Sequence, residues 1–294
     1  MTSLTDTARA KVNLTLRVLG RRPDGYHDLD SIVAFADCAD QLSLDPDRPL
    51  GLTVTGPRAA ECGVLDDNLV LRVARHLGER IAGLKLGHFV LDKHLPAAAG
   101  IGGGSADAPA ALRLLAKANG LAPDDPRLMD VARTTGADIP VCVASRACIM
   151  AGVGENLSPI ALPRLPCVLV NPRVAVATKD VFSALGLRNG QLRVGVSEML
   201  EAITLPKAGA AAQDWLIELS AGVNDLEAPA MKIQPVIGEV LAALRGSEGV
   251  RLARMSGSGA TCFALYETDD AARAAAQALA RAHPDWWVHA GALS

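Results

Sequence analysis

The sequence predicts an α+β protein of two domains, and three observations lead to this class. Apolar and polar residues alternate with period two at 10–18, as in a strand, whereas apolar residues at 68–82 recur with helical spacing. Near the C-terminus the patterns predict strand, turn, strand, helix and strand, an order typical of the α+β class. Three prolines fall within 159–166. We therefore expect one domain at 1–160 and a second at 161–294.

The N-terminal strand predicted at 10–18 has two distinct faces. Val12 and Leu14 lie on its apolar face, and Lys11 and Asn13 lie on its polar face. This alternation is that of a half-buried strand with one side in water. Lys11 is therefore a solvated surface residue unless a functional site recruits it. Further strands are predicted at 29–36, 41–45 and 51–55.

The segment 68–82 carries the clearest helical pattern. Asp67 or Asn68 can cap its first turn, and Gly83 can end it. A strand at 84–92 then leads to Lys93. The other predicted elements are a helix after Ser105 that closes at Asn119-Gly120, a helix near 126–135, a strand at 167–171, helices at 178–186, 226–232 and 235–245, strands at 250–255 and 260–266, a helix at 269–283 and a strand near 286–290, with a loop near 205–213.

The composition excludes several classes of function. Lys and Arg number 29 against 32 Asp and Glu, and no basic run offers a surface for nucleic acid. Aromatic residues make up 3% of the chain, too few to predict a base-stacking platform. The six cysteines form no C-x-x-C pair and stand at no zinc spacing from histidine, so we expect reduced, mostly buried thiols. With no signal-peptide pattern and no run of ~20 apolar residues, the sequence predicts a cytoplasmic protein without a membrane partner.

A glycine-rich segment at 100–105 stands between a predicted strand and a predicted helix. Free backbone N–H groups at a helix start attract anions, and glycines let a phosphate approach the backbone. The Walker pattern does not fit, because the chain contains no Gly-Lys pair. The pattern G-x-G-x-x-G begins at Gly100 but meets Ser105 at its last position. A second glycine turn, at 256–259, is either a plain hairpin or a second wall of a phosphate site.

Two further positions carry candidate chemistry. Asp138 follows Gly-Ala and precedes Ile-Pro, an apolar and conformationally restricted setting. It is either a turn or helix-cap residue, or a general base or a carboxylate near a metal. Tyr26 and His27 follow the Pro-Asp-Gly turn at 23–25 and are, by default, partly buried loop residues.

Several of these segments together resemble one enzyme superfamily. In chain order they are Lys11-Val12-Asn13-Leu14, Gly20-Arg21-Arg22-Pro23-Asp24-Gly25-Tyr26-His27, Leu95-Pro96 with Gly100–Ser105, Gly136-Ala137-Asp138-Ile139-Pro140 and Ser256-Gly257-Ser258-Gly259. The set resembles the GHMP kinase superfamily. The segment ending in Tyr26-His27, with Asn224-Asp225-Leu226-Glu227, makes it similar to the kinases that act on a cytidine diphosphate conjugate of methylerythritol. The resemblance covers about 9–266.

This resemblance implies a two-domain α+β GHMP kinase fold. The N-terminal domain would be ribosomal-protein-S5-domain-2-like and would carry most of the ATP site. The C-terminal domain would be ferredoxin-like, with the substrate in the cleft between the two. The implied reaction is ATP-dependent phosphorylation of the 2-hydroxyl of the methylerythritol conjugate, in the non-mevalonate route to isopentenyl diphosphate. The implied state is a monomer or a weak homodimer.

The resemblance also implies roles for individual residues. Asp138 would take the proton of the substrate hydroxyl, and Lys11 beside it would polarise that hydroxyl and offset phosphate charge. ATP with Mg²⁺ or a similar divalent cation would be the cofactor. The ATP-binding residues would be Asn68, Lys93, Pro96, Ala97, Ala98, Ala99, Gly100, Ile101, Gly102, Gly103, Gly104, Ser105 and Ala106. The substrate-binding residues would be Asn13, Tyr26, His27, Thr178 and Phe182, with His27 bonding the base and Phe182 stacking on it.

The chain departs from the family pattern at two positions. Ser105 is followed by Ala106 where the family usually has a second hydroxyl, which leaves the metal-ligating residue open. Pro109 removes a backbone donor, so we expect the helix to begin nearer Asp107, with Pro109 in its first turn.

Two alternative functions remain at this point. The first is a sibling kinase of homoserine, mevalonate or galactose, but a substrate without a base gives no reason for Tyr26, His27 and Phe182. The second is a catalytically inactive nucleotide-binding protein on the same fold, against which the presence of both Lys11 and Asp138 argues.

Overall fold

The computed structural model describes residues 3–96, 100–101, 103–193, 205–207 and 209–294. The chain forms two compact units, and each unit is built from segments that are far apart in the sequence. Unit 1 contains the described residues of Met1–Lys11, Cys38–Ala97 and Gly102–Ser145. Unit 2 contains those of Val12–Asp37, Ala98–Ile101 and Arg146–Ser294. The long strand β3 (His27–Asp45) contributes its first half to unit 2 and its second half to unit 1.

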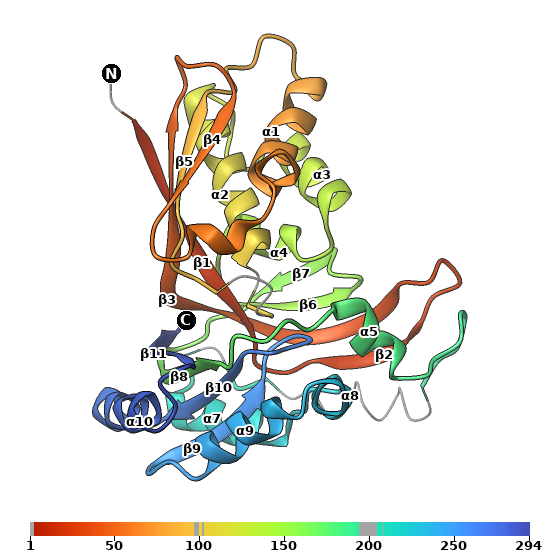
Figure 1. The fold of residues 1–294 in the computed structure, drawn as a ribbon. Coiled ribbons are helices and arrows are strands. Elements are labelled where there is room, and N and C mark those ends of the chain that lie inside the picture. The colour runs from red at the N-terminus through yellow and green to blue at the C-terminus, as the bar shows by residue number, and fades with distance from the viewer. Residues whose placement is uncertain (1–2, 97–99, 102, 194–204, 208) are drawn as a thin grey trace. The chain divides into compact units, whose positions relative to one another are not determined.

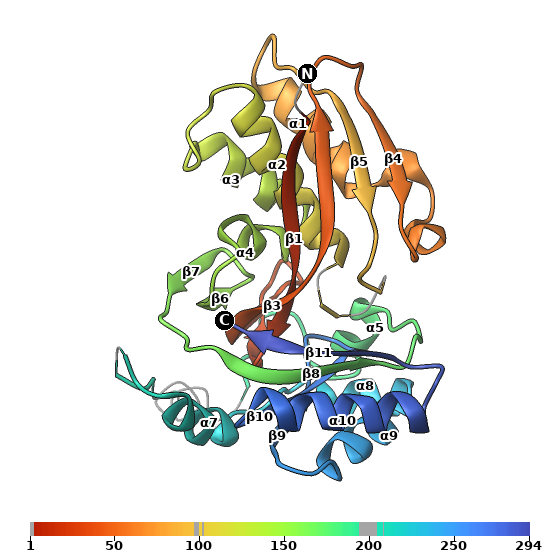
Figure 2. The ribbon, with the colours of Figure 1, turned by 90° about the vertical axis from the view of Figure 1, so that its left-hand side faces the viewer.

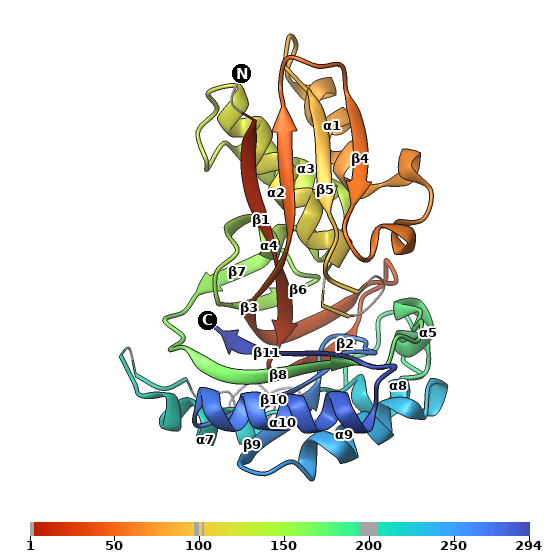
Figure 3. The ribbon, with the colours of Figure 1, turned by 60° about the vertical axis from the view of Figure 1, so that its left-hand side comes forward.

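In unit 1, helices cover one face of a small sheet (Figures 1 and 3). Strand β5 pairs in parallel with β4 and antiparallel with the second half of β3, and β1 also pairs with β3. The elements are β1 (Leu4–Asn13), β4 (Gly51–Thr55), the 3-10 turns η1 (Ala59–Cys62) and η2 (Leu65–Asp67), α1 (Leu69–Arg80), β5 (His88–Asp92), α2 (Gly103–Ala118), α3 (Pro126–Thr135) and α4 (Ile139–Ala144).

Helix α1 confirms the prediction made for 68–82, although it ends at Arg80. The Asn68 side chain caps it by accepting a hydrogen bond from the backbone N–H of Val70 at 2.9 Å. Its buried face includes Val73 and Leu77, as the spacing predicts. The cap and the apolar stripe are both local features, so the sequence was sufficient to place this helix.

In unit 2, an antiparallel sheet in the order β11-β8-β10-β9 has helices on one face (Figure 2). Its core joins Val168 and Val170 of β8 to Val240 of α9 and Leu279 of α10. The first half of β3 pairs with β2 and β6. The elements are β2 (Arg17–Arg21), β6 (Cys148–Gly152), β7 (Asn156–Pro159), β8 (Leu165–Asn171), α5 (Thr178–Ser183), α7 (Ala212–Ala221), α8 (Glu227–Ile233), α9 (Val236–Arg245), β9 (Val250–Met255), β10 (Cys262–Tyr266), α10 (Asp269–Ala282) and β11 (Trp287–Leu293).

The prediction of a single half-buried strand at 10–18 is wrong in two respects. The chain leaves strand geometry after Asn13 and resumes it at Arg17. Both faces are buried, since Lys11, Asn13 and Thr15 are as inaccessible as their apolar neighbours. Distant residues cover the polar face: Asn13 Nδ2 donates to Ser31 Oγ at 2.8 Å, and Asn13 N–H donates to Ser256 Oγ at 3.1 Å.

Helix α2 begins earlier than predicted. It starts at Gly103 and includes Pro109 in its interior, whereas we expected a start near Asp107. An interior proline removes one intrahelical hydrogen bond, here the one to the Ser105 carbonyl, at a cost of ~3 kcal/mol. Burial of nearly every residue of α2 from Ala106 to Ala116 offsets that cost.

Other elements had weaker sequence signals. Helices α4 and α7 and strands β6 and β7 were not predicted, and the loop expected near 205–213 runs into α7 at its end. All six cysteines lie in the described part of the chain, where none of them forms a disulfide, and four of them are buried. Among the described helices, none combines the length and the apolar character that crossing a bilayer requires.

Candidate active site

Lys11 and Asp138 form an ion pair in unit 1. Lys11, near the end of β1, is buried to 3% exposure, and its Nζ lies 3.5 Å from Oδ2 of Asp138. Asp138 directly precedes α4, and its side chain is 51% exposed. The apolar setting predicted for Asp138 is therefore wrong, because the next two residues turn inward while this carboxylate stays outside. The result is a carboxylate with a cation on one side and an open approach on the other.

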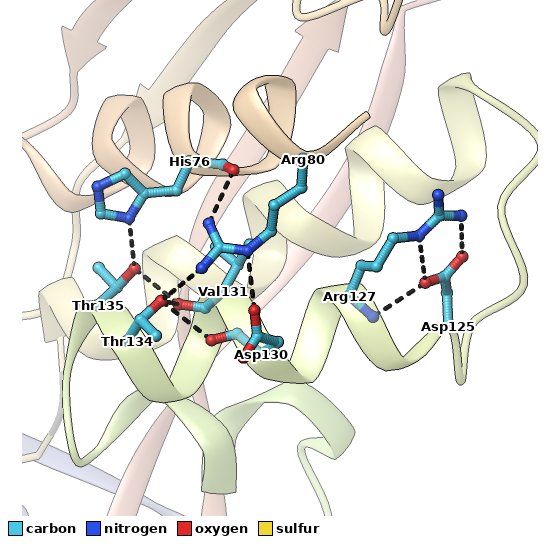
Figure 4. Close-up of polar contacts among 8 residues, drawn as sticks. All are labelled: His76, Arg80, Asp125, Arg127, Asp130, Val131, Thr134 and Thr135. Atoms are coloured by element: carbon cyan, nitrogen blue, oxygen red, sulfur yellow. Dashed lines mark hydrogen bonds and ion pairs between the residues drawn. The ribbon is translucent and has the colours of Figure 1, made fainter. Parts of the chain in front are cut away.

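The contacts between α1 and α3 fix the chain just before Asp138 (Figure 4). His76 Nδ1 lies 3.2 Å from Thr135 Oγ1, in the last turn of α3. Arg80 Nε donates to Asp130 Oδ2 at 2.8 Å, and another guanidinium nitrogen lies 3.4 Å from Thr134 Oγ1. Since α3 ends three residues before Asp138, these contacts also restrict the position of the Asp138 backbone.

The start of α2 supplies backbone donors for an anion. The N–H groups in the first turn of a helix have no intrahelical partner, and among the described residues they belong to Gly103, Gly104 and Ser105. Gly104 is exposed, and Ser105 is partly exposed with a hydroxyl on the same turn. Of the predicted ATP-binding residues, Ala97, Ala98, Ala99 and Gly102 lie outside the described residues.

The two glycine turns meet in unit 2. Gly100 has a positive φ of 71°, and a Cβ there would lie 2.4 Å from the Gly259 carbonyl oxygen. Ser256 Oγ donates to the Gly100 carbonyl oxygen at 3.2 Å. The turn at 256–259 is therefore more than a plain hairpin, because it packs directly against residue 100 of the glycine-rich segment, where only glycine fits.

Lys93 is held between two carboxylates of unit 1. Its Nζ donates to Asp107 Oδ2 at 2.8 Å and to Asp40 Oδ2, and all three side chains are buried. Burial alone would lower the pKa of Lys93, but the charges of Asp107 and Asp40 outweigh it and raise that pKa. Asp40 and Asp107 were missed from the sequence. Asp40 carries no local signal there, because it lies 53 residues before its partner.

The predicted substrate residues lie in unit 2, and several of them come together. The rings of His27 and Phe182 are stacked, with centroids 4.6 Å apart and planes 28° apart. Thr178, at the start of α5, lies with Oγ1 2.9 Å from Ser258 Oγ. Tyr26 is 59% exposed beside His27. Asn13 is buried, and its side chain already donates a hydrogen bond to Ser31 Oγ.

His27 is set up as a neutral ring. Burial lowers its pKa from the ordinary value of 6.5, and the charge of Arg21, its cross-strand neighbour, lowers it further. Its Nε2 is buried and lacks a hydrogen-bond partner in the described part of the chain. Arg21 also donates to the carbonyl oxygens of Gly25 and Leu187, at 3.2 and 3.1 Å, and so shapes the turn that presents the ring.

We expect His27 to titrate below 6.5 when followed by NMR of its ring protons. Arg21→Gln removes the neighbouring charge, so the pKa of His27 should rise in that variant yet stay below 6.5, because burial is the larger cause. The unfolded chain takes up this proton near pH 6.5 and the folded chain only at lower pH, so His27 costs folding stability as the pH falls below 6.5.

Arg21→Lys is the matched control for this titration, since it keeps the charge and should leave the His27 pKa nearly unchanged. A wild-type His27 that titrates at or above 6.5 would contradict the assignment of a buried neutral ring.

The oxygen ligands at the start of α2 fit a magnesium ion that takes most of its other ligands from a nucleotide and from water. Within the described residues no group of three or more His, Cys, Asp or Glu side chains is arranged for a metal. Mg²⁺ commonly keeps several waters and takes its other ligands from phosphates and one or two protein oxygens. Ser105 offers such an oxygen, whereas Ala106 offers none.

Comparison with known proteins identifies the family. The model described as "GHMP kinases N terminal domain" matches residues 68–146, and "GHMP kinases C terminal" matches 208–285. The chain is 67% identical to a 4-diphosphocytidyl-2-C-methyl-D-erythritol kinase of Rhodopseudomonas palustris, over 99% of this chain and 98% of that protein.

Solved structures agree. A crystal structure of 4-(cytidine 5'-diphospho)-2C-methyl-D-erythritol kinase superposes with a TM-score of 0.77 and 36% identity, covering 99% of both chains. A homoserine kinase from Cytophaga hutchinsonii gives a TM-score of 0.72 over 99% of this chain and 95% of that one, but at 16% identity it shares the fold alone. The chain therefore belongs to the GHMP kinases and, within them, to the 4-diphosphocytidyl-2-C-methyl-D-erythritol kinase family.

Proposed function

We propose that the chain transfers the γ-phosphoryl group of ATP to the 2-hydroxyl of 4-diphosphocytidyl-2-C-methyl-D-erythritol, in the non-mevalonate route to isopentenyl diphosphate. The assignment of this substrate is supported by the 67% sequence identity, over 99% of the chain, to the kinase of Rhodopseudomonas palustris. The observation that supports phosphoryl transfer is the ion pair of Lys11 and Asp138, because the Asp138 carboxylate is held by Lys11 and is still exposed to an incoming substrate.

Asp138 acts as the general base in this proposal. Its carboxylate takes the proton of the 2-hydroxyl while the hydroxyl oxygen bonds to the γ-phosphorus and the bond to the β-phosphate oxygen breaks, releasing ADP. Lys11 holds Asp138 in position and offsets the charge that gathers on the transferred group. A base of this kind contributes about 10²–10⁴-fold to the rate.

The ATP phosphates bind at the first turn of α2. Its free N–H groups and the positive end of the helix dipole favour an anion there. Ser105 would offer the protein oxygen for Mg²⁺, which would supply further positive charge to the phosphates. The other nucleotide contacts proposed are Asn68, Lys93, Pro96, Ala97, Ala98, Ala99, Gly100, Ile101, Gly102, Gly103, Gly104 and Ala106.

The cytidine group binds to the cluster of unit 2 that contains His27 and Phe182. A neutral His27 with an unpaired Nε2 can hydrogen-bond a pyrimidine edge, and Phe182 offers an aromatic face. Tyr26, Thr178 and Asn13 complete the proposed substrate contacts.

Four broader features remain proposals. They are the division of the chain at 160/161, the ribosomal-protein-S5-domain-2-like and ferredoxin-like character of the two domains, a state of monomer or weak homodimer, and a cytoplasmic location.

A coupled assay of ADP release tests the function directly. We expect turnover with Mg-ATP and the cytidyl diphosphate methylerythritol substrate, and none with mevalonate, homoserine or galactose. Turnover with one of those three instead would overturn the assignment of His27 and Phe182 to a base. ATP binding without turnover of any of the four substrates would instead favour the alternative that the chain is a catalytically inactive nucleotide-binding protein.

A further inference from the structure

A buried triad of charged side chains joins three elements of unit 1. Asp40 comes from β3, Lys93 directly follows β5, and Asp107 lies in α2. Lys93 Nζ donates to one carboxyl oxygen of each aspartate, and the side chains are 3%, 0% and 3% exposed for Lys93, Asp40 and Asp107. Lys93 thus ties the start of α2 to the sheet beneath it.

Asp40 uses both of its carboxyl oxygens. Oδ2 accepts from Lys93, and Oδ1 accepts from the backbone N–H groups of His94 and Leu95, at 2.6 and 2.8 Å. All of these partners are donors. The carboxylate therefore fixes both the ammonium group of Lys93 and the course of the chain as it leaves β5.

Asp107 uses only one of its oxygens. Oδ2 accepts from Lys93, while Oδ1 is buried and has no hydrogen-bond partner among the described residues. Two carboxylates facing one ammonium leave an excess negative charge in a dry site. Burial and the charge of Asp40 accordingly raise the pKa of Asp107, against the opposing effect of Lys93.

The triad lies immediately beneath the first residue of α2. A Cβ on Gly103 would lie 3.3 Å from Lys93 Nζ, so the ammonium group is in contact range of the turn whose N–H groups are unpaired. Any shift of Lys93 would change both the position of that turn and the positive charge beneath it.

We propose that Asp40 and Asp107 are positioning residues for ATP, which act through Lys93 to hold the first turn of α2 in place for the phosphates. The inference rests on the proposed function, which assigns the phosphates to that turn. The proposal adds to the ATP site two residues that do not touch ATP or the substrate. Asp40 must accept hydrogen bonds with both carboxyl oxygens, whereas Asp107 needs only one accepting oxygen.

The different requirements make a sharp test, because the same isosteric change should have opposite outcomes at the two aspartates. In Asp107→Asn, the amide oxygen can keep the Lys93 contact while its NH₂ takes the place of the unpartnered Oδ1. In Asp40→Asn, the NH₂ must face either Lys93 or the two backbone N–H groups. Because all of these groups are hydrogen-bond donors, the amide NH₂ repels them and at least one of the present hydrogen bonds is lost.

The measurement is Mg-ATP binding by calorimetry, together with KM for ATP and KM for the cytidyl substrate. We expect Asp40→Asn and Asp107→Ala to weaken ATP binding about 10–100-fold, the range typical of residues that support a binding group. KM for the cytidyl substrate should change less than twofold. Asp107→Asn should bind ATP within about threefold of wild type.

Asp45→Asn, at the far end of the same strand, is the matched control and should leave ATP binding unchanged. Thermal melting checks that each variant is folded, and if Asp40→Asn fails to fold, Asp107→Ala against Asp107→Asn decides the question. Wild-type ATP affinity in a folded Asp40→Asn or Asp107→Ala, equal losses for ATP and the cytidyl substrate, or equal damage by Asn and Ala at 107 would each overturn the inference. If the wild-type chain itself binds no ATP, the proposed function fails instead.

Discussion

Replacing Asp138 by asparagine should lower kcat by about 10²–10⁴-fold, the contribution typical of a general base, and leave the fold intact. The side chain is half exposed and makes no capping hydrogen bond to α4, so an isosteric amide removes no packing. It removes only the group that can accept the proton of the substrate hydroxyl. The coupled assay of ADP release gives kcat, and thermal melting reports on the fold.

Asp124→Asn provides the control, since this exposed aspartate lies before the start of α3, at the opposite end of that helix from Asp138. It should retain wild-type activity. A kcat for Asp138→Asn within threefold of wild type would remove Asp138 from the role of base.

The pair should also behave as a unit. Lys11→Met removes the cation that orients Asp138, so adding Asp138→Asn to it should cost far less than the two single effects combined. Independent, additive losses would mean that the 3.5 Å contact has no catalytic meaning.

Replacing Arg254 by leucine should destabilise the protein by roughly 3–5 kcal/mol, the largest effect on stability that we expect. Arg254, in β9, is buried and donates to the carbonyl oxygens of Leu14, Leu219 and Gly222. Burial lowers its pKa to about 10, so the guanidinium is still charged at neutral pH. Its loss removes three charge-assisted hydrogen bonds and leaves buried acceptors without this donor.

The measurement is the melting temperature, which should fall by roughly 10 °C for a loss of this size. Arg251→Leu is the matched control in the same strand, because Arg251 is exposed and forms a surface ion pair with Glu267 at 3.4 Å. That pair is worth about 0–1 kcal/mol. Equal melting temperatures for the two variants would refute the role given to Arg254.

Elements with local signals were predictable from the sequence. Helix α3 lies where a Pro at its first position and the Asp125 cap place it, and strand β9 matches its predicted range. Among the site residues, Lys11 and Asp138 meet, as do His27 and Phe182.

What the sequence could not predict depends on contacts between distant segments. The burial of Asn13 requires Ser256, 243 residues later, and no window around residue 13 contains that information. Asp40 shows the same limitation, because the donors it holds lie 53 to 55 residues away. The exposure of Asp138 depends on which side of a short helix turns inward, which its apolar neighbours alone do not decide.

The interleaving of the two units also has a consequence for biosynthesis. Residues 12–37 belong to unit 2 but are translated before most of unit 1, and most of the rest of unit 2 lies in 146–294. The carbonyl oxygen of Leu14 is hydrogen-bonded by the guanidinium of Arg254, 240 residues downstream, whereas every segment of unit 1 lies before residue 146. On the ribosome, unit 1 can therefore complete its contacts first. Strand β2 and the first half of β3 can pair with each other early, but their contacts with residues 146–294 form only after the C-terminal part emerges. This long loop closure makes unit 2 the slower of the two to fold.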